Sequence, residues 1–257
     1  MNRPLALLSN DDGFNRAGIR AIRDAMLPRF DVVIVAPEAE QSASSHSLSL
    51  HRPLRSREVE PGIFAVDGTP ADCVYVALHG GARYLPRRPD VVISGLNHGL
   101  NMGQDVFYSG TVAAAREGAL RGIPAIATSA ESKADRNACA LAVASFALTL
   151  IKEVANGEAT RAPLLNLNFP RRWNGKLRVT TLGRRIYDEV VDIRVDPRGR
   201  EYLWLGGPGI SHDALPGSDT EAYDAGFASL TPLLLDLTSS SSDLVQLLQT
   251  AVSKHTP

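Results

Sequence analysis

The chain has 257 residues, of which 44% are hydrophobic and 21% are charged, the composition of an ordinary globular protein. We expect one large α/β domain over residues 1–257, since this length is ample for a sizeable core. The net charge of −1 excludes the basic excess with which proteins bind long nucleic acids or anionic membranes.

Two features indicate the compartment. Cys73 and Cys139 are the only cysteines and have neither metal-ligand spacing nor a disulfide framework, which favours buried thiols in a reducing cytoplasm. We expect no secretory signal, because only residues 5–8 are continuously apolar before acidic residues follow. The longest apolar stretch, residues 138–151, is too short to span a bilayer and predicts a core helix. The sequence therefore predicts a cytoplasmic protein without a membrane anchor.

The first two thirds of the chain alternate short apolar runs with helical patterns. Residues 5–8 predict a buried strand, and apolar positions at helical spacing between residues 17 and 26 predict a helix after it. Thr69 followed by Pro70 predicts the N-terminus of another helix, which runs towards residue 80. We expect further strands at 31–37, 63–66, 90–94, 122–128 and 164–169, and further helices at 112–121 and 136–154. This alternation indicates a three-layer αβα, Rossmann-like fold with a largely parallel sheet.

Beyond residue 175 the pattern changes to strands without intervening helices. Strand-like segments are expected at 177–182, 186–195 and 201–205, with a turn at 196–199. They predict a C-terminal β-hairpin arm within an excursion over residues 176–225, which has no core of its own and packs against another subunit of a homodimer or tetramer. We expect Arg184, Arg185, Arg198 and Arg200 on a solvated face, and the alternative is that they contact substrate across a dimer. A strand at 231–237 and a helix near 242–252 complete the chain.

The first predicted strand ends in the acidic turn Asn10-Asp11-Asp12-Gly13. Ligands of open α/β sheets bind beyond the carboxyl ends of the strands, where this turn is expected. The adjacent carboxylates of Asp11 and Asp12 repel each other, and a divalent cation would relieve that repulsion. The alternative is a solvated turn whose acidic residues favour the N-terminus of the following helix.

Two further loops are expected at the same edge of the sheet. The loop at 38–49 holds Ser42 and His46, and the loop at 95–103 holds three glycines together with Asn97, His98 and Asn101. Carboxylate, hydroxyl and amide oxygens suit Mg²⁺, Mn²⁺ or Ca²⁺ better than zinc. His46 and His98 are candidate proton donors to a leaving oxygen, and the alternative is that each histidine is solvated or satisfies a backbone carbonyl.

A small hydroxyl-bearing turn, Ser109-Gly110-Thr111, opens an alanine-rich helix. Ser109 or Thr111 is expected to cap this helix, whose free N–H groups and dipole would bind an anion such as phosphate. The alternative is an ordinary capped helix. A divalent metal beside a helix N-terminus that binds anions is the combination that phosphoryl transfer needs.

Five sequence blocks resemble the SurE family of survival-protein acid phosphatases, or nucleotidases. The blocks are residues 9–13, 68–74, 94–101, 108–115 and 231–238, and they extend over most of the chain in the family's order. Two segments depart from the family pattern. Arg16-Ala17-Gly18-Ile19 stands where the family usually has Ala-Pro-Gly-Ile, and Gln41-Ser42-Ala43-Ser44 stands where it usually has Arg-Ser-Gly-Ala.

The resemblance implies hydrolysis of nucleoside 5′- and 3′-monophosphates to nucleoside and phosphate, with one Mn²⁺ or Mg²⁺ per subunit, and in some members exopolyphosphatase activity. It implies metal ligands at Asp11, Asp12, Ser42 and Asn97, and phosphate contacts at Asn101, Ser109, Gly110 and Thr111. With Asp11 and Asp12 as the catalytic residues, we expect direct attack by metal-activated water, since the Asp-x-Asp of phosphatases that form an aspartyl phosphate is missing here. The alternative is that one of the two aspartates is the nucleophile or the base.

Two other functions are compatible with these residues. A non-catalytic sensor could use the same cation and the same crevice to bind a nucleotide or phosphate. A metal-dependent nuclease is the competing enzyme class, although the near-neutral charge argues against a long nucleic-acid substrate.

Overall fold

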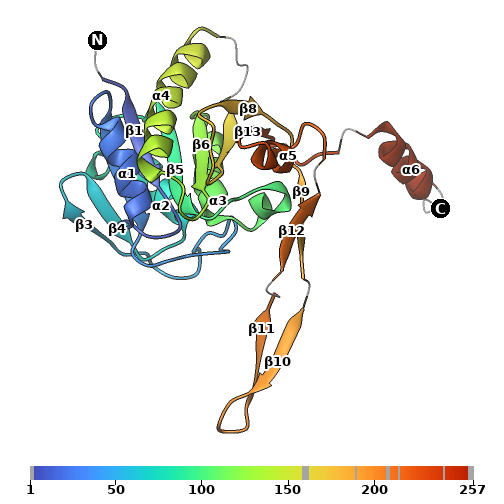
Figure 1. The fold of residues 1–257 in the computed structure, drawn as a ribbon. Helices are drawn as coiled ribbons and strands as arrows, with labels where there is room; N and C mark the ends of the chain where they lie inside the picture. Colours follow the sequence, from blue (N-terminus) through green and yellow to red (C-terminus); the bar gives the residue numbers. More distant parts are fainter. Residues whose placement is uncertain are drawn as a thin grey trace.

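The computed structural model describes residues 3–157, 162–188, 190–206, 209–213, 215–239 and 241–253. Within these residues the centre of the molecule is a nine-stranded sheet of order β3-β4-β2-β1-β5-β6-β7-β13-β8 (Figure 1). Its strands are β1 (Leu5–Ser9), β2 (Asp31–Pro37), β3 (Ser56–Glu60), β4 (Ile63–Val66), β5 (Val91–His98), β6 (Ala125–Ala130), β7 (Leu164–Phe169), β8 (Leu177–Val179) and β13 (Ala228–Leu233). Neighbouring strands are parallel except in the pairs β3–β4 and β7–β13, which confirms the predicted largely parallel α/β fold.

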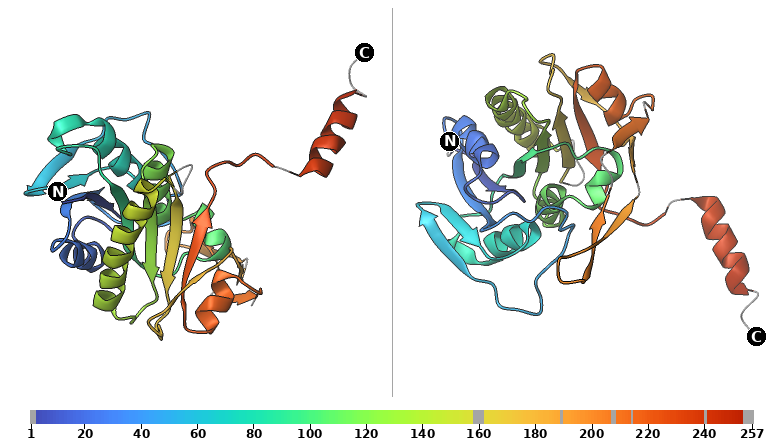
Figure 2. Two further views of the ribbon diagram at one scale, coloured as in Figure 1. Left: turned by 90° about the horizontal axis from the view of Figure 1, so that it is seen from above. Right: turned by 60° about the horizontal axis from the view of Figure 1, so that its bottom comes forward.

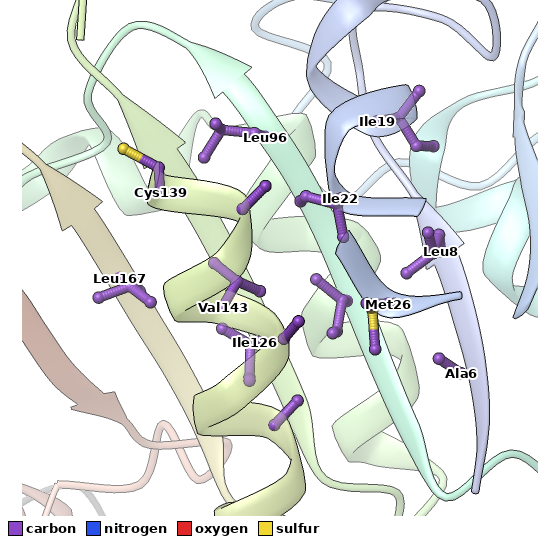
Figure 3. Close-up of a cluster of buried hydrophobic side chains, with 14 of the residues drawn as sticks. Ala6, Leu8, Ile19, Ile22, Met26, Leu96, Ile126, Cys139, Val143 and Leu167 are labelled. Atoms are coloured by element: carbon purple, nitrogen blue, oxygen red, sulfur yellow. The ribbon is translucent and has the colours of Figure 1, made fainter. Parts of the chain in front are cut away.

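Two helices cover each face of this sheet. The helices are α1 (Ala17–Met26), α2 (Pro70–His79), α3 (Gly110–Leu120) and α4 (Arg136–Ala155), with short 3₁₀ helices η1 (Gly81–Arg83) and η2 (Gly103–Phe107). Helices α1 and α4 pack side by side on one face, where Ile22, Met26 and Val143 lie in the core with Leu8 (Figure 3). Helices α2 and α3 pack together on the other face around a second core cluster.

Local signals explain where two of these helices lie. The Thr69 hydroxyl accepts a hydrogen bond from the amide of Asp72, and the Asp72 carboxylate accepts one from the amide of Thr69, which is a capping box before Pro70. Helix α4 is long and apolar enough to cross a membrane by length and composition. However, its residues Cys139 and Val143 are buried against the sheet, as predicted for a core helix. Cys73 and Cys139 are both free and buried.

The predicted arm projects from the body as two antiparallel strand pairs (Figure 1). Strand β9 (Arg184–Tyr187) pairs with β12 (Ile210–Asp213), and β10 (Val191–Val195) pairs with β11 (Glu201–Leu205). Residues 189, 207, 208 and 214 of the predicted excursion lie outside the described residues. Helix α5 (Asp219–Asp224) returns the chain to β13, and helix α6 (Ser242–Ser253) lies apart from the body (Figure 2).

Several predicted boundaries were wrong. The segment 186–195 is not one strand but parts of β9 and β10, and the late strand spans Ala228–Leu233 instead of residues 231–237. Strands β3 and β12 and helix α5 were not predicted. Strand β3 lies at the edge of the sheet with largely polar, exposed residues, so it lacks the apolar run that marks a buried strand.

Candidate functional site

A cavity of about 970 Å³ opens at the carboxyl ends of β1, β2 and β5. The structure brings together here residues from all three predicted loops and from the turn before α3. The predicted site residues that line the cavity are Asp11, Asp12, Ser42, Asn97, His98, Asn101 and Ser109. This placement follows from the parallel sheet, because the ends of adjacent parallel strands lie at one edge.

The carboxylates of Asp11 and Asp12 lie next to each other and are partly shielded from solvent. Asp11 is only 6% exposed, and the Thr111 hydroxyl donates a hydrogen bond to its Oδ1. Burial raises the pKa of Asp11, against the opposing effect of the Thr111 hydrogen bond, and the charge of Asp12 raises it further. Burial also raises the pKa of Asp12, an effect that the His98 backbone amide opposes. Among the described residues, neither carboxylate forms an ion pair within 4.0 Å, so a bound cation would supply the missing positive charge.

The neighbouring oxygens fit a hard divalent cation. The side-chain nitrogen of Asn97 donates to the Gly99 carbonyl at 2.9 Å, which leaves Oδ1 as the free ligand atom of that side chain. The Ser42 hydroxyl donates to Glu40 at 2.9 Å and keeps its lone pairs. The described part of the chain contains no group of three or more His, Cys, Asp or Glu residues that could hold a metal. A cation here would therefore use two carboxylates with neutral oxygens, a set typical of Mg²⁺ or Mn²⁺.

The loop that carries Ser42 adopts an unusual backbone conformation. Ala43 and Ser45 have φ angles of 55° and 53°, in the left-handed region that favours glycine. Such a conformation costs on the order of 1 kcal/mol for a residue with a side chain, so its surroundings must hold it. The Ser45 amide donates to the Tyr108 carbonyl at 3.0 Å, and the Gln41 amide donates to the Asp11 carbonyl at 2.8 Å. The loop is thus fixed between the acidic turn and the segment before α3.

The N-terminus of α3 presents backbone amides next to the acidic turn. The Ser109 hydroxyl caps the helix by accepting a hydrogen bond from the Val112 amide at 3.1 Å. The first backbone hydrogen bond within the helix runs from the Ala113 amide to the Ser109 carbonyl. The amides of Gly110 and Thr111 therefore have no partner within the helix. The hydroxyl and the backbone amide of Thr111 both interact with the Asp11 carboxylate, so the Gly110 amide is the group of this turn that remains for an anion. Gly110 and Thr111 are not among the described residues that line the cavity.

The two candidate histidines have different positions. His98 lines the cavity, whereas His46 is not among the described residues that do. His46 Nε2 lies 3.0 Å from Oε2 of Glu117, a carboxylate that is only 2% exposed and also bonds Arg121 at 2.8 Å. His46 therefore connects the loop at 38–49 to α3, and of the two candidates only His98 lines the cavity.

The cavity also contains residues that the sequence did not suggest. Its wall includes Glu40, Asp105, Glu131, Lys133, Arg136 and Tyr187. The expectation that Arg185 is solvated was wrong, because its side chain is 14% exposed and lies 2.8 Å from Asp105. Asp105 and Arg185 are 80 positions apart, and no local pattern relates the arm to η2.

Comparisons with known proteins show the family to which the chain belongs. Residues 6–189 match the family model described as survival protein SurE. The chain is 60% identical to a 5′-nucleotidase SurE of Sorangium cellulosum over 235 residues, an alignment that covers 91% of each of the two chains. It is 44% identical to a 5′-nucleotidase SurE of Syntrophotalea carbinolica, over 93% of this chain and 94% of that one. The crystal structure of a SurE protein from Aquifex aeolicus superposes with a TM-score of 0.78 at 36% identity, covering 96% of this chain and 100% of that chain.

Proposed function

Because the chain belongs to the SurE family and is a phosphoric monoester hydrolase, we propose that it releases phosphate from nucleoside 5′-monophosphates in the cavity at Asp11 and Asp12. The observation that carries this proposal is the pair of carboxylates without an ion-pair partner among the described residues, directly beside the N-terminus of α3. A cation site next to amides that bind an anion is what a phosphate monoester requires.

In this proposal Asp11, Asp12, Ser42 and Asn97 hold one Mn²⁺ or Mg²⁺ per subunit. When bound, such a cation offsets the negative charge of the phosphate and lowers the pKa of a coordinated water. The raised pKa values of Asp11 and Asp12 support this assignment, since a neighbouring cation would stabilise both ionised carboxylates.

The phosphate would be held by the Gly110 amide together with the side chains of Ser109 and Asn101, while Thr111 holds Asp11 beside it. The position of Asn101 is well defined, because its amide donates to Asn168 at 2.8 Å and its side chain donates to Ser129 at 3.0 Å. Fixed donors of this kind stabilise the charge that develops in phosphoryl transfer without reorganising. Water attacks the phosphorus directly in this proposal, and detection of a trapped phospho-aspartate would contradict it.

The proposal extends to the finer expectations from the sequence. Nucleoside 3′-monophosphates are further substrates, with polyphosphate as a side activity, and the enzyme works in the cytoplasm as a homodimer or tetramer assembled through the arm. Exposed apolar side chains on β10 and β11, such as Ile193, Trp204 and Leu205, support the assembly, since an isolated hairpin with such a surface is marginally stable in water.

The first test is turnover of AMP. We expect phosphate release with Mn²⁺ or Mg²⁺, its loss in excess EDTA, and its return when the metal is added back, measured as inorganic phosphate. Tight AMP binding without phosphate release would favour the nucleotide sensor instead. Full activity in excess EDTA would contradict the metal site.

His98→Gln tests which histidine protonates the leaving oxygen. We expect kcat for AMP to fall about 100-fold, the typical effect of removing a general acid. p-Nitrophenyl phosphate should be far less affected, because its leaving group departs without a proton. His46→Gln is the matched control, since a positioning residue bound to Glu117 should affect both substrates equally. Equal losses for both substrates in His98→Gln would rule out this role.

A further inference from the structure

The cavity is larger than a phosphate and a cation require, and part of its wall comes from the arm. Its volume of about 970 Å³ is near the upper end of the range of roughly 300–1,000 Å³ for small-molecule sites. Tyr187, the last residue of β9, lines this cavity together with Asp105 and is 40% exposed. Tyr187 therefore brings an aromatic ring from the arm to the cavity that would hold the phosphate, where the ring can contact the nucleoside part of the substrate.

Two neighbours fix the orientation of the Tyr187 ring. The Tyr187 hydroxyl donates a hydrogen bond to Oδ1 of Asp105. The guanidinium of Arg185 lies over the ring, 5.5 Å from its centroid, and is itself 2.8 Å from Oδ2 of Asp105. Burial and the hydrogen bond to Asp105 raise the pKa of Tyr187 to about 12, so the hydroxyl remains a donor. The side chain is therefore held at both its hydroxyl and one face of its ring.

The strand that carries Tyr187 is in turn fixed to the phosphate side of the cavity. The Asp219 carboxylate accepts hydrogen bonds from the amides of Gly103 at 2.9 Å and Gly183 at 2.7 Å. The Arg185 amide donates to the Gln104 side chain at 3.0 Å. These contacts join the base of the arm to η2, which leads directly into the turn at Ser109. The distance from Tyr187 to the phosphate-binding amides is thus set by packed, hydrogen-bonded segments.

We propose that Tyr187 is the platform on which the nucleobase of the substrate stacks, which makes it a specificity-determining residue. This inference rests on the proposed nucleotidase function. The Arg185 guanidinium lies over one face of the ring, and Tyr187 still lines the cavity. Every nucleobase has a π-face, and stacking on an aromatic side chain contributes about 1–3 kcal/mol per base. A platform held in place by Asp105 and Arg185 binds the base without the loss of its own side-chain freedom.

The test compares a substrate that has a base with one that lacks it. In Tyr187→Leu we expect kcat/KM for AMP to fall about ten-fold or more, mainly through KM, which corresponds to about 1.4 kcal/mol. The value for ribose 5-phosphate, which has the same phosphate and sugar but no base, should stay within about two-fold of wild type. Tyr187→Phe keeps the ring and should retain most of the AMP activity.

Tyr202→Leu is the matched control, because Tyr202 lies on β11 of the same arm with 41% exposure and is not among the described residues that line the cavity. It should leave both substrates unchanged. Equal losses for AMP and ribose 5-phosphate in Tyr187→Leu would overturn the platform and indicate a general role in holding the arm. Tyr108 also lines the cavity and is 66% exposed, so a selective loss of kcat/KM for AMP in Tyr108→Leu but not in Tyr187→Leu would also overturn the proposal. If wild-type protein hydrolysed neither substrate, the proposed function itself would fail.

Discussion

Asp11→Asn is expected to abolish phosphate release and, in metal-free protein at neutral pH, to raise the free energy of unfolding. Activity should fall by at least about 100-fold, since loss of a single preorganised electrostatic group commonly lowers kcat by about 10²–10³. Stability should rise because burial raises the pKa of Asp11, which means that the ionised carboxylate is less stable in the folded chain than in the unfolded one. The side-chain carbonyl of the introduced asparagine can still accept the Thr111 hydroxyl. Phosphate assays and thermal unfolding in EDTA measure the two effects.

The direction of the pH dependence follows from the same shift. Between the ordinary value of 3.8 and the raised folded pKa, the folded protein binds more protons than the unfolded chain. Wild-type stability should therefore fall as pH rises through that window, and the decline should be smaller in Asp11→Asn, in which only the raised pKa of Asp12 remains. Excess Mn²⁺ should raise the Tm of wild type, because a ligand that binds the folded state stabilises it, and should have little effect on the variant. An equal gain in Tm for both proteins would contradict a cation at Asp11.

The framework of the fold was predictable because its strands are buried on both faces. Such strands have continuous apolar runs, and the predicted segment 31–37 coincides with β2. Helix α2 was located by its cap, since Thr69 and Pro70 form a local signal that needs no tertiary contact. Strand β12 has no such signal. Helix α5 has one, since the Ser218 hydroxyl accepts a hydrogen bond from the Glu221 amide at its N-terminus, but its six residues are too few to show an apolar period. Their short segments are held by particular contacts, such as the hydrogen bond between the Thr220 hydroxyl and the Asp213 carbonyl.

The site was predictable only as far as strand ends determine it. Asp11 follows β1 and Asn97 lies at the carboxyl end of β5, its parallel neighbour, so the topology alone places them at one edge of the sheet. The partners of individual loop side chains depend on packing between distant segments. His46 and Glu117 are 71 positions apart, and no local pattern pairs them. The same holds for Tyr187, whose place at the cavity depends on how the base of the arm binds to η2.

Gly110→Ala is expected to lower kcat/KM by about 100-fold while α3 still forms. A Cβ at Gly110 would lie 2.8 Å from the Cβ of Asp11 and 2.9 Å from the Ser44 hydroxyl, so one of these neighbours must move. Asp11 is hydrogen-bonded to Thr111, which follows Gly110 in α3. A displacement of Asp11 would therefore move its carboxylate relative to the N-terminus of α3. A displacement of about 1 Å in an active site can lower the rate by about 10². Steady-state kinetics with AMP measures the effect.

Gly118→Ala in the same helix separates a local effect on the site from a general loss of stability. Its added Cβ would lie 2.6 Å from a methyl group of Val92, in the core between α3 and the sheet and away from the cavity. Overpacking of this kind costs about 1–3 kcal/mol, so both variants should unfold at lower temperature than wild type. Only Gly110→Ala should lose activity at temperatures where both are folded. Equal losses of activity in both variants would contradict a specific role of Gly110 in the site. The close approach of α3 to Asp11 would then matter for stability alone, and the phosphate would have to bind elsewhere in the cavity.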